Sequence, residues 1–292
     1  MNIAFATSAD HRNLTDDDRL AASSLEQRGA RVTPAVWDDP SMDWTTFDSV
    51  VVRSTWDYYN RAAEFRGWID SLERAGAPVW NPPALLRWNM EKTYLRDIER
   101  AGARIVPTAW LPRGSEGDVS SLLSGVLAER GWKEAVIKPA VSAAAHRTWR
   151  VAQADVPAMA EQLAESLSTC DVMVQPFMRE IQERGEWSLL FFDGEFSHAV
   201  RKTPVAGDFR VQTTFGGQSV SDHPGTAVLE AARRVLSAVP MPSPWLYARV
   251  DGIETAQGFM LLELEMLEPS LFLSHSASGT ARFADSIMRR AR

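Results

Sequence analysis

Short apolar runs alternate with amphipathic segments over the first 80 residues of the chain. In the amphipathic segments, apolar residues recur every three or four positions, which is typical of helices, whereas the short runs are typical of strands. The predicted elements, in chain order, are a strand at 2–7, a helix from Thr15 to about Arg28, strands at 31–37 and 49–54, a helix at 61–75 capped by Asn60, and a short strand that reaches Pro82-Pro83. This alternation indicates a small α/β unit with a parallel sheet.

The pattern changes after Pro82-Pro83, which we interpret as a domain boundary. The elements predicted next are a helix that carries Asn89 and Lys92 and ends near Gly102, strands at 104–110, 135–138 and 149–151, and helices at 119–129 and 156–167. Between them, Val141 to His146 is a run of small residues whose backbone N–H groups could hold a phosphate. From residue 172 the pattern becomes antiparallel, so we divide the chain into units at 1–83, 84–173 and 174–292.

The pair Asp193-Gly194 predicts a β-hairpin between residues 186 and 202, because this dipeptide suits a two-residue turn. Counting outward from such a turn places Glu186 directly opposite Arg201, at the open end of the hairpin. A helix at 226–239 and a last helix from about Thr280 are predicted farther along the chain.

The stretch from Trp245 to Leu273 has acidic residues where a core strand should have none. Strand side chains alternate between two faces, so Glu263 and Glu265 are expected on one face, while the face formed by residues 260, 262, 264 and 266 is wholly apolar. The expected companions of the two acids are Phe259, Leu261 and Leu267. The preceding strand offers Arg249 and Asp251, two positions apart. Buried carboxylates need partners, so the pattern indicates either a divalent-cation site or a buried ion-pair network.

Composition and charge exclude several classes of protein. The chain is 45% hydrophobic and 24% charged, as in ordinary globular proteins, and its net charge of −7 disfavours a nucleic-acid partner. No basic run indicates a membrane surface, no apolar run is long enough to cross a bilayer, and the N-terminus lacks the features of a secretory signal. A single cysteine, Cys170, excludes an internal disulfide and fits a reducing cytoplasm, where we expect the protein to act.

Only four of the 31 basic residues are lysines: Lys92, Lys133, Lys138 and Lys202. A lysine kept in an arginine-rich background indicates a site that needs a compact ammonium, although chance retention would explain any one of them. The sequence has no G-x-S-x-G, C-x-x-C, H-E-x-x-H or Walker-type glycine loop. Separated lysines, a small-residue loop, an arginine and three strand carboxylates could together hold a nucleoside triphosphate and Mg²⁺.

Taken in order, these motifs resemble the ATP-grasp superfamily over essentially the whole chain, with the glutathione-synthetase-like and ribosomal-protein glutamate ligases as the nearest branch. The resemblance implies a mixed α/β and α+β architecture, the ATP-grasp fold. In it, an N-terminal parallel α/β pre-domain precedes a small lobe and a large lobe, both α+β, that enclose an ATP cleft.

The resemblance also assigns roles to matching residues. Those assigned to ATP are Lys92, Lys138, Gln175, Pro176, Phe177, Met178, Glu186, Arg201 and Lys202, with 175–178 as the hinge beside adenine. Asp251, Glu263 and Glu265 match the ligands of a metal ion, Mg²⁺ with Mn²⁺ as the alternative. Arg249 matches the arginine that steadies the transferred phosphoryl group, and Arg210, in a segment similar to the glutamate-ligase signature, would face phosphate and substrate carboxylate.

Two positions depart from the superfamily's pattern. Glu265 stands where the usual motif has asparagine, which adds a negative charge to the metal site. The loop from Val141 to His146 is rich in serine and alanine rather than glycine, which restricts how closely its backbone can approach a phosphate.

The implied activity is that of an ATP-dependent ligase, which activates a carboxylate as an acylphosphate and forms an amide-type C–N bond. The compact length, the run TWDYY at 55–59 and EPSLFL at 268–273 are similar to stand-alone ATP-grasp enzymes of antibiotic biosynthesis. Ring closure of O-ureido-D-serine to D-cycloserine is the reaction that we prefer. The candidate substrate residues are Arg53 with Ser54, and Arg210, for a carboxylate, Asp57 for an amino group, and Glu268, whose role stays open.

Two other functions remain open at this point. One is a glutamate or peptide ligase that joins two separate substrates. The other is a non-catalytic nucleotide-binding protein, which the presence of all three metal-ligand carboxylates disfavours. For an enzyme, we expect a small amino-acid-like carboxylate as the partner, with no nucleic acid and no membrane, and the resemblance allows a homodimer.

Overall fold

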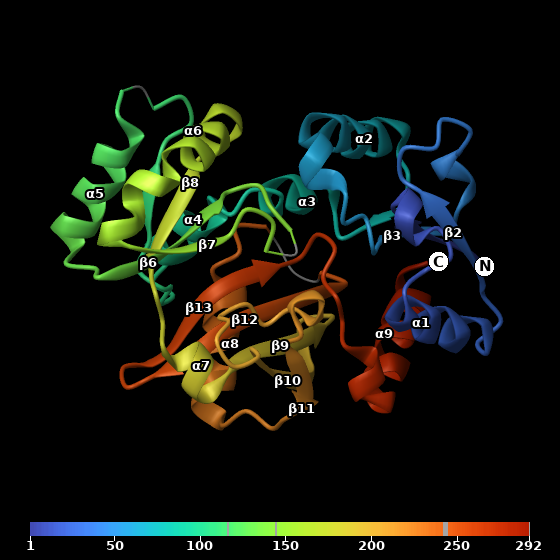
Figure 1. Ribbon diagram of the computed structural model, residues 1–292. Helices are drawn as coiled ribbons and strands as arrows, with labels where there is room; N and C mark the ends of the chain where they lie inside the picture. Colours follow the sequence, from blue (N-terminus) through green and yellow to red (C-terminus); the bar gives the residue numbers. More distant parts are fainter. Residues whose placement is uncertain (116, 144, 242–244, 292) are drawn as a thin grey trace.

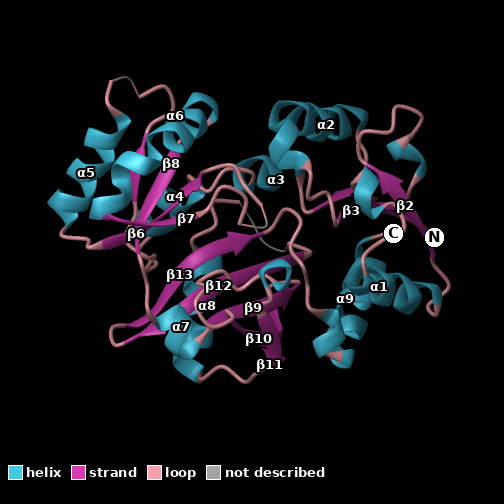
Figure 2. Ribbon diagram, viewed as in Figure 1, coloured by secondary structure: helices cyan, strands magenta, loops and turns pink. Residues whose placement is uncertain are grey.

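A computed structural model describes residues 1–115, 117–143, 145–241 and 245–291, and it contains three sheets with helices packed against them (Figures 1 and 2). The N-terminal sheet is parallel and the other two are antiparallel, which is the mixed α/β and α+β architecture predicted. Among the described residues, no helix combines the length and the apolar character needed to span a bilayer.

The pre-domain is built on a sheet with the strand order β2-β1-β3-β4. Its elements are β1 (Asn2–Thr7), α1 (Asp16–Glu26), β2 (Arg31–Val36), β3 (Ser49–Val52), α2 (Ala62–Ala75) and β4 (Val79–Trp80). Thr15 caps α1 as predicted, because its hydroxyl accepts the backbone N–H of Asp18. Asn60 does not cap α2. It lies inside a 3-10 turn, Tyr58–Arg61, that precedes the helix, so this prediction was wrong.

The small lobe has the strand order β5-β8-β6-β7. Its strands are β5 (Ala109–Leu111), β6 (Glu134–Pro139), β7 (Trp149–Ala152) and β8 (Val172–Pro176), and its sheet packs against α5 (Val119–Arg130) and α6 (Ala160–Thr169). The domain limit expected after residue 173 falls inside β8, whose whole length pairs within this sheet. We therefore propose to place that limit after Pro176.

The segment that joins the pre-domain to the small lobe differs from the single helix predicted. It forms two short helices, α3 (Pro83–Asn89) and α4 (Tyr94–Arg100). Lys92 lies in the break between them, where its backbone N–H donates to the carbonyl of Ala140 at 2.8 Å. The break ties this lysine to the end of β6, beside the small-residue loop.

The large lobe has the strand order β11-β10-β9-β12-β13. Its strands are β9 (Glu186–Phe192), β10 (Glu195–Thr203), β11 (Gln218–Ser221), β12 (Tyr247–Thr255) and β13 (Gly258–Glu265), and its helices are α7 (Glu180–Arg184), α8 (Thr226–Ser237) and α9 (Ala277–Arg290). Figure 1 shows α9 beside α1, so the last helix lies against the first.

Two β-bulges correct the strand faces predicted from simple alternation. A register shift between Phe196 and His198 places Glu186 opposite Lys202, rather than opposite Arg201. A second shift leaves Leu262 unpaired between Leu261, opposite Gly252, and Glu263, opposite Asp251.

Because of this second bulge, Phe259 and Leu261 do not share a face with the two acids of β13. They pack in the main core with Leu264 and Met266, while Leu262 joins a separate small cluster. Glu263 and Glu265 line a cavity instead.

Buried hydrogen bonds join the pre-domain to the large lobe. The Asn81 amide donates to the carbonyls of Tyr247 at 2.9 Å and Met266 at 2.8 Å, and its oxygen accepts the backbone N–H of Leu246 at 2.7 Å. The Tyr247 hydroxyl lies 2.8 Å from the carbonyls of both Val52 and Leu267. The end of the parallel sheet is thereby fixed to the start of β12 and to the segment after β13.

We expect Tyr247→Phe to lower the free energy of unfolding by about 1–2 kcal/mol, because it leaves two buried carbonyls without their shared donor. Urea unfolding followed by circular dichroism measures the loss. Tyr59→Phe is the matched control, since the half-buried Tyr59 hydroxyl makes no hydrogen bond to any described residue, and its effect should stay within about 0.5 kcal/mol. Equal losses in both variants would contradict this account of the junction.

Candidate active site

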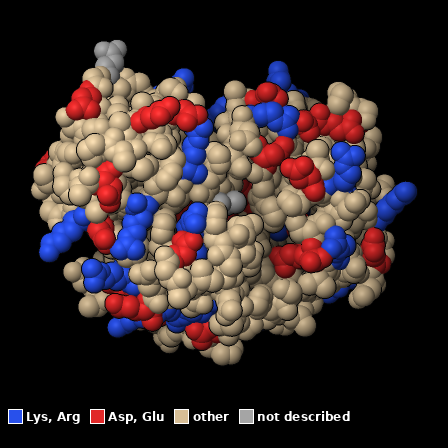
Figure 3. All heavy atoms as spheres, viewed as in Figure 1, with Lys and Arg blue, Asp and Glu red and all other residues tan. Residues whose placement is uncertain are grey.

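A cavity of about 370 Å³ lies where the pre-domain, the small lobe and the large lobe meet. The space-filling view shows this hollow near the centre of the face, with basic side chains along its edge (Figure 3). Its floor is formed by Arg249 and Asp251 of β12 and by Glu263 and Glu265 of β13, and its roof includes Val136 and Lys138 of β6. Residues far apart in the chain therefore surround one cavity.

Among the residues that the structure describes, ten charged ones line the cavity, and their signs balance. They are the cations Lys92, Lys138, Lys202, Arg210 and Arg249 and the acids Glu186, Asp251, Glu263, Glu265 and Glu268. Burial makes an unpaired charge expensive, so pairing among these groups decides which of them can receive a ligand.

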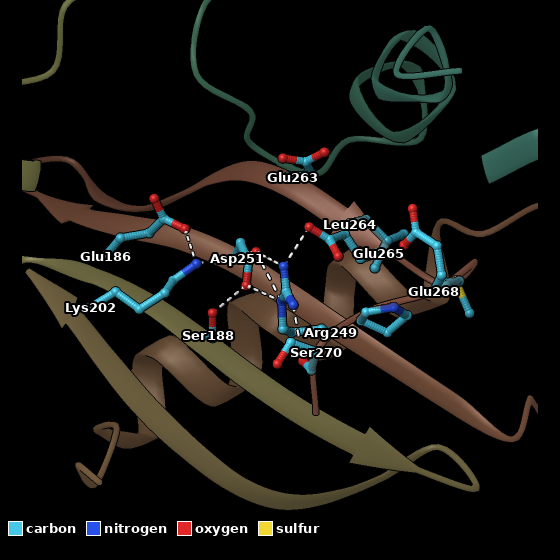
Figure 4. Close-up of polar contacts among 12 residues, drawn as sticks. Glu186, Ser188, Lys202, Arg249, Asp251, Glu263, Leu264, Glu265, Glu268 and Ser270 are labelled. Carbon is cyan, nitrogen blue, oxygen red and sulfur yellow. Dashed lines mark hydrogen bonds and ion pairs between the residues drawn. The ribbon is translucent and has the colours of Figure 1, made fainter. Parts of the chain in front are cut away.

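Arg249 and Asp251 form the centre of this set. They lie two apart on β12, and the guanidinium holds both carboxylate oxygens, with Nε–Oδ1 at 3.0 Å and Nη2–Oδ2 at 2.9 Å. Ser188 donates to Asp251 at 2.6 Å, and Arg249 also contacts Glu265 and donates to the Ser270 carbonyl at 2.9 Å (Figure 4). Arg249 thus holds β12, β13 and the EPSLFL segment together at the cavity floor.

Two lysines hold further acids. The ammonium of Lys92 lies 2.9 Å from a Glu263 oxygen and also donates to the carbonyl of Ser142. Lys202 lies 2.5 Å from Glu186 and 3.4 Å from Asp251. The bulge in β10 explains the contact between Lys202 and Glu186, since it turns Lys202 rather than Arg201 toward that acid.

Lys138 stands apart from these pairs. Among the described residues, no carboxylate lies within ion-pair distance of its ammonium. Burial lowers the pKa of Lys138 from its ordinary value, against the opposing charge of Glu263. A buried cation of this kind is suited to an anionic group, such as a phosphate.

Burial beside other acids raises the pKa of Glu265 to about 8. Burial is the main cause, and the charges of Glu263, Asp251 and Glu268 add to it, so together they outweigh Arg249. The pKa of Glu263 is lowered instead. Burial acts to raise it, but the charges of Lys92 and Lys138 outweigh that effect.

The chain shows two matches to family models. Residues 3–81 match the N-terminal domain of D-cycloserine synthetase DcsG, and residues 119–240 match the ATP-grasp domain of prokaryotic glutathione synthetase. The chain is 31% identical over 261 residues to cycloserine biosynthesis protein DcsG of Streptomyces lavendulae, and this match covers 87% of each protein. The chain belongs to the ATP-grasp ligases.

Solved structures agree with this assignment. The crystal structure of D-cycloserine synthetase DcsG matches the ligase with a TM-score of 0.91 at 28% identity, over 100% of both chains. D-alanine–D-alanine ligase from Bacillus anthracis in complex with ATP matches with a TM-score of 0.69 at 15% identity, over 100% of this chain and 97% of that one, which shows a shared fold. The predicted ATP-grasp fold and the predicted ATP-dependent C–N ligase activity are thereby confirmed.

Most of the predicted ATP residues of this ligase meet at the cavity. Lys92, Lys138, Gln175, Pro176, Met178, Glu186 and Lys202 line it. Phe177 and Arg201 are outside its described lining. The Phe177 ring lies under the Arg150 guanidinium, with its centroid 3.8 Å from Cζ, and Arg201 covers Trp187 and contacts Asp222 and Glu254.

The predicted catalytic arginine Arg210 also lines the cavity of the ligase. Asp208, two residues before it, accepts from Nε at 3.1 Å and from Nη2 at 2.8 Å, and the Phe215 ring lies 3.7 Å beneath the guanidinium. The side chain is held in place by its own loop, with one side available to a ligand. The small-residue loop contributes Ser142, Ala143 and Ala145, while Ala144 lies outside the described residues.

Three predicted substrate residues are placed elsewhere. Arg53 is 2% exposed, pairs with Asp18 at 2.8 Å and donates to the carbonyl of Pro269 at 2.9 Å. Ser54 lies in a buried contact with Thr7, and Asp57 accepts from Trp37 and Arg61. None of the three belongs to the cavity lining in the described part of the ligase, so a role in binding substrate is not supported. Their polar groups serve the pre-domain and its junction.

The neighbours of these residues reach the cavity instead. Trp56 and Tyr58, from the same loop, line it together with Ser270 and Phe272 of the EPSLFL segment. The aromatic run after a parallel strand was a signal for this wall. Its residues Trp56 and Tyr58 line the cavity, whereas Asp57 accepts from Trp37 and Arg61.

The turn that carries Phe272 is held from the pre-domain. Phe272 has a φ of 51°, which is unusual for a bulky residue and requires support from its surroundings. Asp17 of α1 provides it, because its carboxylate accepts the backbone N–H groups of Leu271 at 3.0 Å and Leu273 at 2.5 Å.

The carboxylates offer the donor type that a divalent cation prefers. In this structure, however, no group of three His, Cys, Asp or Glu side chains among the described residues is arranged to hold an ion. Cations occupy the acids instead, with Lys92 on Glu263 and Arg249 on both Asp251 and Glu265. The donor chemistry of the ligase therefore fits a metal, while its binding would require Glu263 and Glu265 to change partners.

We expect the raised pKa of Glu265 to make the ligand-free protein less stable as the pH rises. The folded state keeps this proton up to about pH 8, whereas the unfolded chain releases it near the ordinary value of 4.5, so the free energy of unfolding falls between these values. Glu265→Gln removes this contribution. Urea midpoints at three pH values should show the variant gaining stability over wild type toward pH 8. A stability difference between the variant and wild type that does not change with pH would contradict the raised pKa of Glu265.

Proposed function

We propose that the ligase activates a carboxylate with ATP and closes it onto a nitrogen of the same molecule, as in the conversion of O-ureido-D-serine to D-cycloserine. The match to DcsG over the full length of both chains supports this proposal, because it includes the pre-domain. That domain supplies Trp56 and Tyr58, which line the cavity.

ATP would lie between the two lobes. Gln175, Pro176 and Met178 would border adenine, Glu186 the ribose, and Lys138 the phosphates. Lys92 and Lys202 would also bind phosphate oxygens. For this, Lys92 would give up part of its contact with Glu263, and Lys202 part of its contact with Glu186. Lys138 supports its role most directly, since its ammonium has no ion-pair partner among the described residues that an anion would have to replace.

We propose Mg²⁺, or Mn²⁺, as the bound divalent metal, held by Asp251, Glu263 and Glu265. When bound, it would neutralise charge on the phosphates that the reaction rearranges. The high pKa of Glu265 agrees with this role, because the crowded acids lack a sufficient cation in the ligand-free protein. Arg249 would then give up part of its contact with Glu265 and contact the transferred phosphoryl group.

The ligation has two steps. The substrate carboxylate attacks the γ-phosphorus of ATP, which gives an acylphosphate and ADP. A substrate nitrogen then attacks the acyl carbon, the C–N bond forms and phosphate leaves. With O-ureido-D-serine, the carbamoyl group on that nitrogen must also be lost, by hydrolysis to carbon dioxide and ammonia, to give D-cycloserine. Arg249 and Arg210 would stabilise the negative charge that develops on oxygen in both steps. The two lobes, closed around the substrates, would keep water from the acylphosphate, which would otherwise hydrolyse.

A ligase that joins two separate substrates is the second candidate, supported by the match of residues 119–240 to the glutathione synthetase ATP-grasp domain. We also propose that the protein acts in the cytoplasm, which its single cysteine at Cys170 and its use of ATP support.

We expect O-ureido-D-serine, with ATP and Mg²⁺, to stimulate phosphate release at least about tenfold over ATP alone, with D-cycloserine as a product detected by mass spectrometry. Single amino acids and pairs of amino acids serve as the comparison. Stimulation that requires a pair, with none from O-ureido-D-serine, would establish the two-substrate ligase and overturn ring closure.

We expect Glu263→Gln to reduce substrate-stimulated phosphate release at least about 100-fold, because it removes a charged metal ligand and the partner of Lys92. The urea midpoint should show that the fold is kept. Glu230→Gln, on the exposed side of α8, is the matched control and should leave turnover unchanged. Near-normal activity of Glu263→Gln would refute the metal assignment.

A further inference from the structure

One acid in the cavity has no cation of its own. Glu186, Asp251, Glu263 and Glu265 each contact a lysine or an arginine. Among the described residues, the carboxylate of Glu268 makes no ion pair, and its one hydrogen-bond contact is its own backbone N–H. It carries no dashed line in Figure 4. The cavity therefore keeps an unpaired cation, Lys138, and an unpaired anion, Glu268.

Glu268 is not a solvated surface acid. The residue is 6% exposed, and the little surface it keeps belongs to the cavity wall. Burial raises the pKa of Glu268 to about 7, assisted by Glu263 and opposed by Lys92 and Arg249. An acid in such a place costs stability, and a cationic ligand would recover part of that cost.

The surroundings of Glu268 favour an organic cation. Trp56 donates its indole N–H to the Glu268 carbonyl at 2.9 Å, and Trp56, Tyr58 and Phe272 line the same cavity. Aromatic faces beside a carboxylate attract an ammonium group, whose three donors need acceptors and whose charge is stabilised by the rings.

The position of Glu268 relative to Arg249 agrees with an α-amino acid. Arg249 donates to the carbonyl of Ser270, two residues after Glu268, and its charge acts on the Glu268 carboxylate. In an α-amino acid, the ammonium group is attached to the carbon next to the carboxylate. An ammonium on Glu268 would therefore bring the carboxylate toward Arg249, where the proposed activation takes place.

We infer that Glu268 binds the α-ammonium group of the substrate and makes the ligase specific for carboxylates that carry one. This inference rests on the proposed function and extends it, because it states which substrate group the pre-domain side of the cavity recognises. The predicted role of Asp57 thereby passes to Glu268, since Asp57 is held by Trp37 and Arg61.

The test compares O-ureido-D-serine with 3-(ureidooxy)propanoate, the same molecule without its amino group. Binding of each is measured by calorimetry in the presence of Mg²⁺ and a non-hydrolysable ATP analogue, and phosphate release is measured with ATP. Wild type should bind the amino compound at least about tenfold more tightly. Glu268→Gln should weaken binding of the amino compound by a similar factor and leave the des-amino compound and the KM for ATP unchanged.

Two further variants keep the result interpretable. Glu268→Asp retains the charge and should keep part of the preference for the amino compound, and Glu230→Gln should retain all of it. Urea midpoints of all variants report whether each one folds. If Glu268→Gln does not fold, Glu268→Asp becomes the deciding variant. Its preference for the amino compound must then be smaller than that of wild type but still measurable.

The outcomes separate the two ideas. Preferential binding of the amino compound that depends on Glu268, without turnover, supports the inference and contradicts the proposed ring closure. Turnover with a preference unaltered by Glu268→Gln supports ring closure and overturns the inference. A rise in the KM for ATP alone would assign Glu268 to ATP or metal binding and also overturn it. Absence of binding by wild type overturns both.

Discussion

The near-complete pairing of opposite charges in one buried cavity is the constraint on which the rest of the structure depends. Carboxylates from β9, β12 and β13 line the same cavity, and only the adjacent cations make their burial tolerable. The strands must keep their register for these contacts to form, so the bulges at Leu262 and at the start of β10 are part of the site. Nucleotide binding would then be an exchange of ion partners within a set already assembled.

The junction of the pre-domain with the large lobe is the second requirement. Asn81 and Tyr247 satisfy backbone groups of both parts, and the buried pair of Arg53 with Asp18 lies beside them and reaches the carbonyl of Pro269. These contacts fix the wall formed by Trp56 and Tyr58 relative to Arg249. The small lobe approaches the same cavity from the other side through Lys138 and the hinge.

Much of this could be predicted from residue patterns, and the failures have physical causes. The parallel sheet, the Asp193-Gly194 hairpin and the pair Arg249 and Asp251 follow from local alternation and turn chemistry. A bulge adds one residue to a strand, so alternation could not assign Phe259 and Leu261 to the core or Lys202 to the cavity. Arg53 and Asp57 carry suitable chemistry, but their partners lie far away in the sequence, and only the folded chain shows that those partners occupy them. The break at Lys92 likewise depends on Ala140.

The carboxylate of Asp17 joins the first helix to the turn around Phe272, near the other end of the chain. A ribosome adds Asp17 to the chain 254 residues before it adds Leu271. During synthesis, the lobes that surround the nucleotide can therefore assemble while the substrate wall is still unfinished. The turn around Phe272 follows the last strand of the large lobe, β13, so a product cut between the two would lack this part of the substrate wall even where its nucleotide cleft had formed.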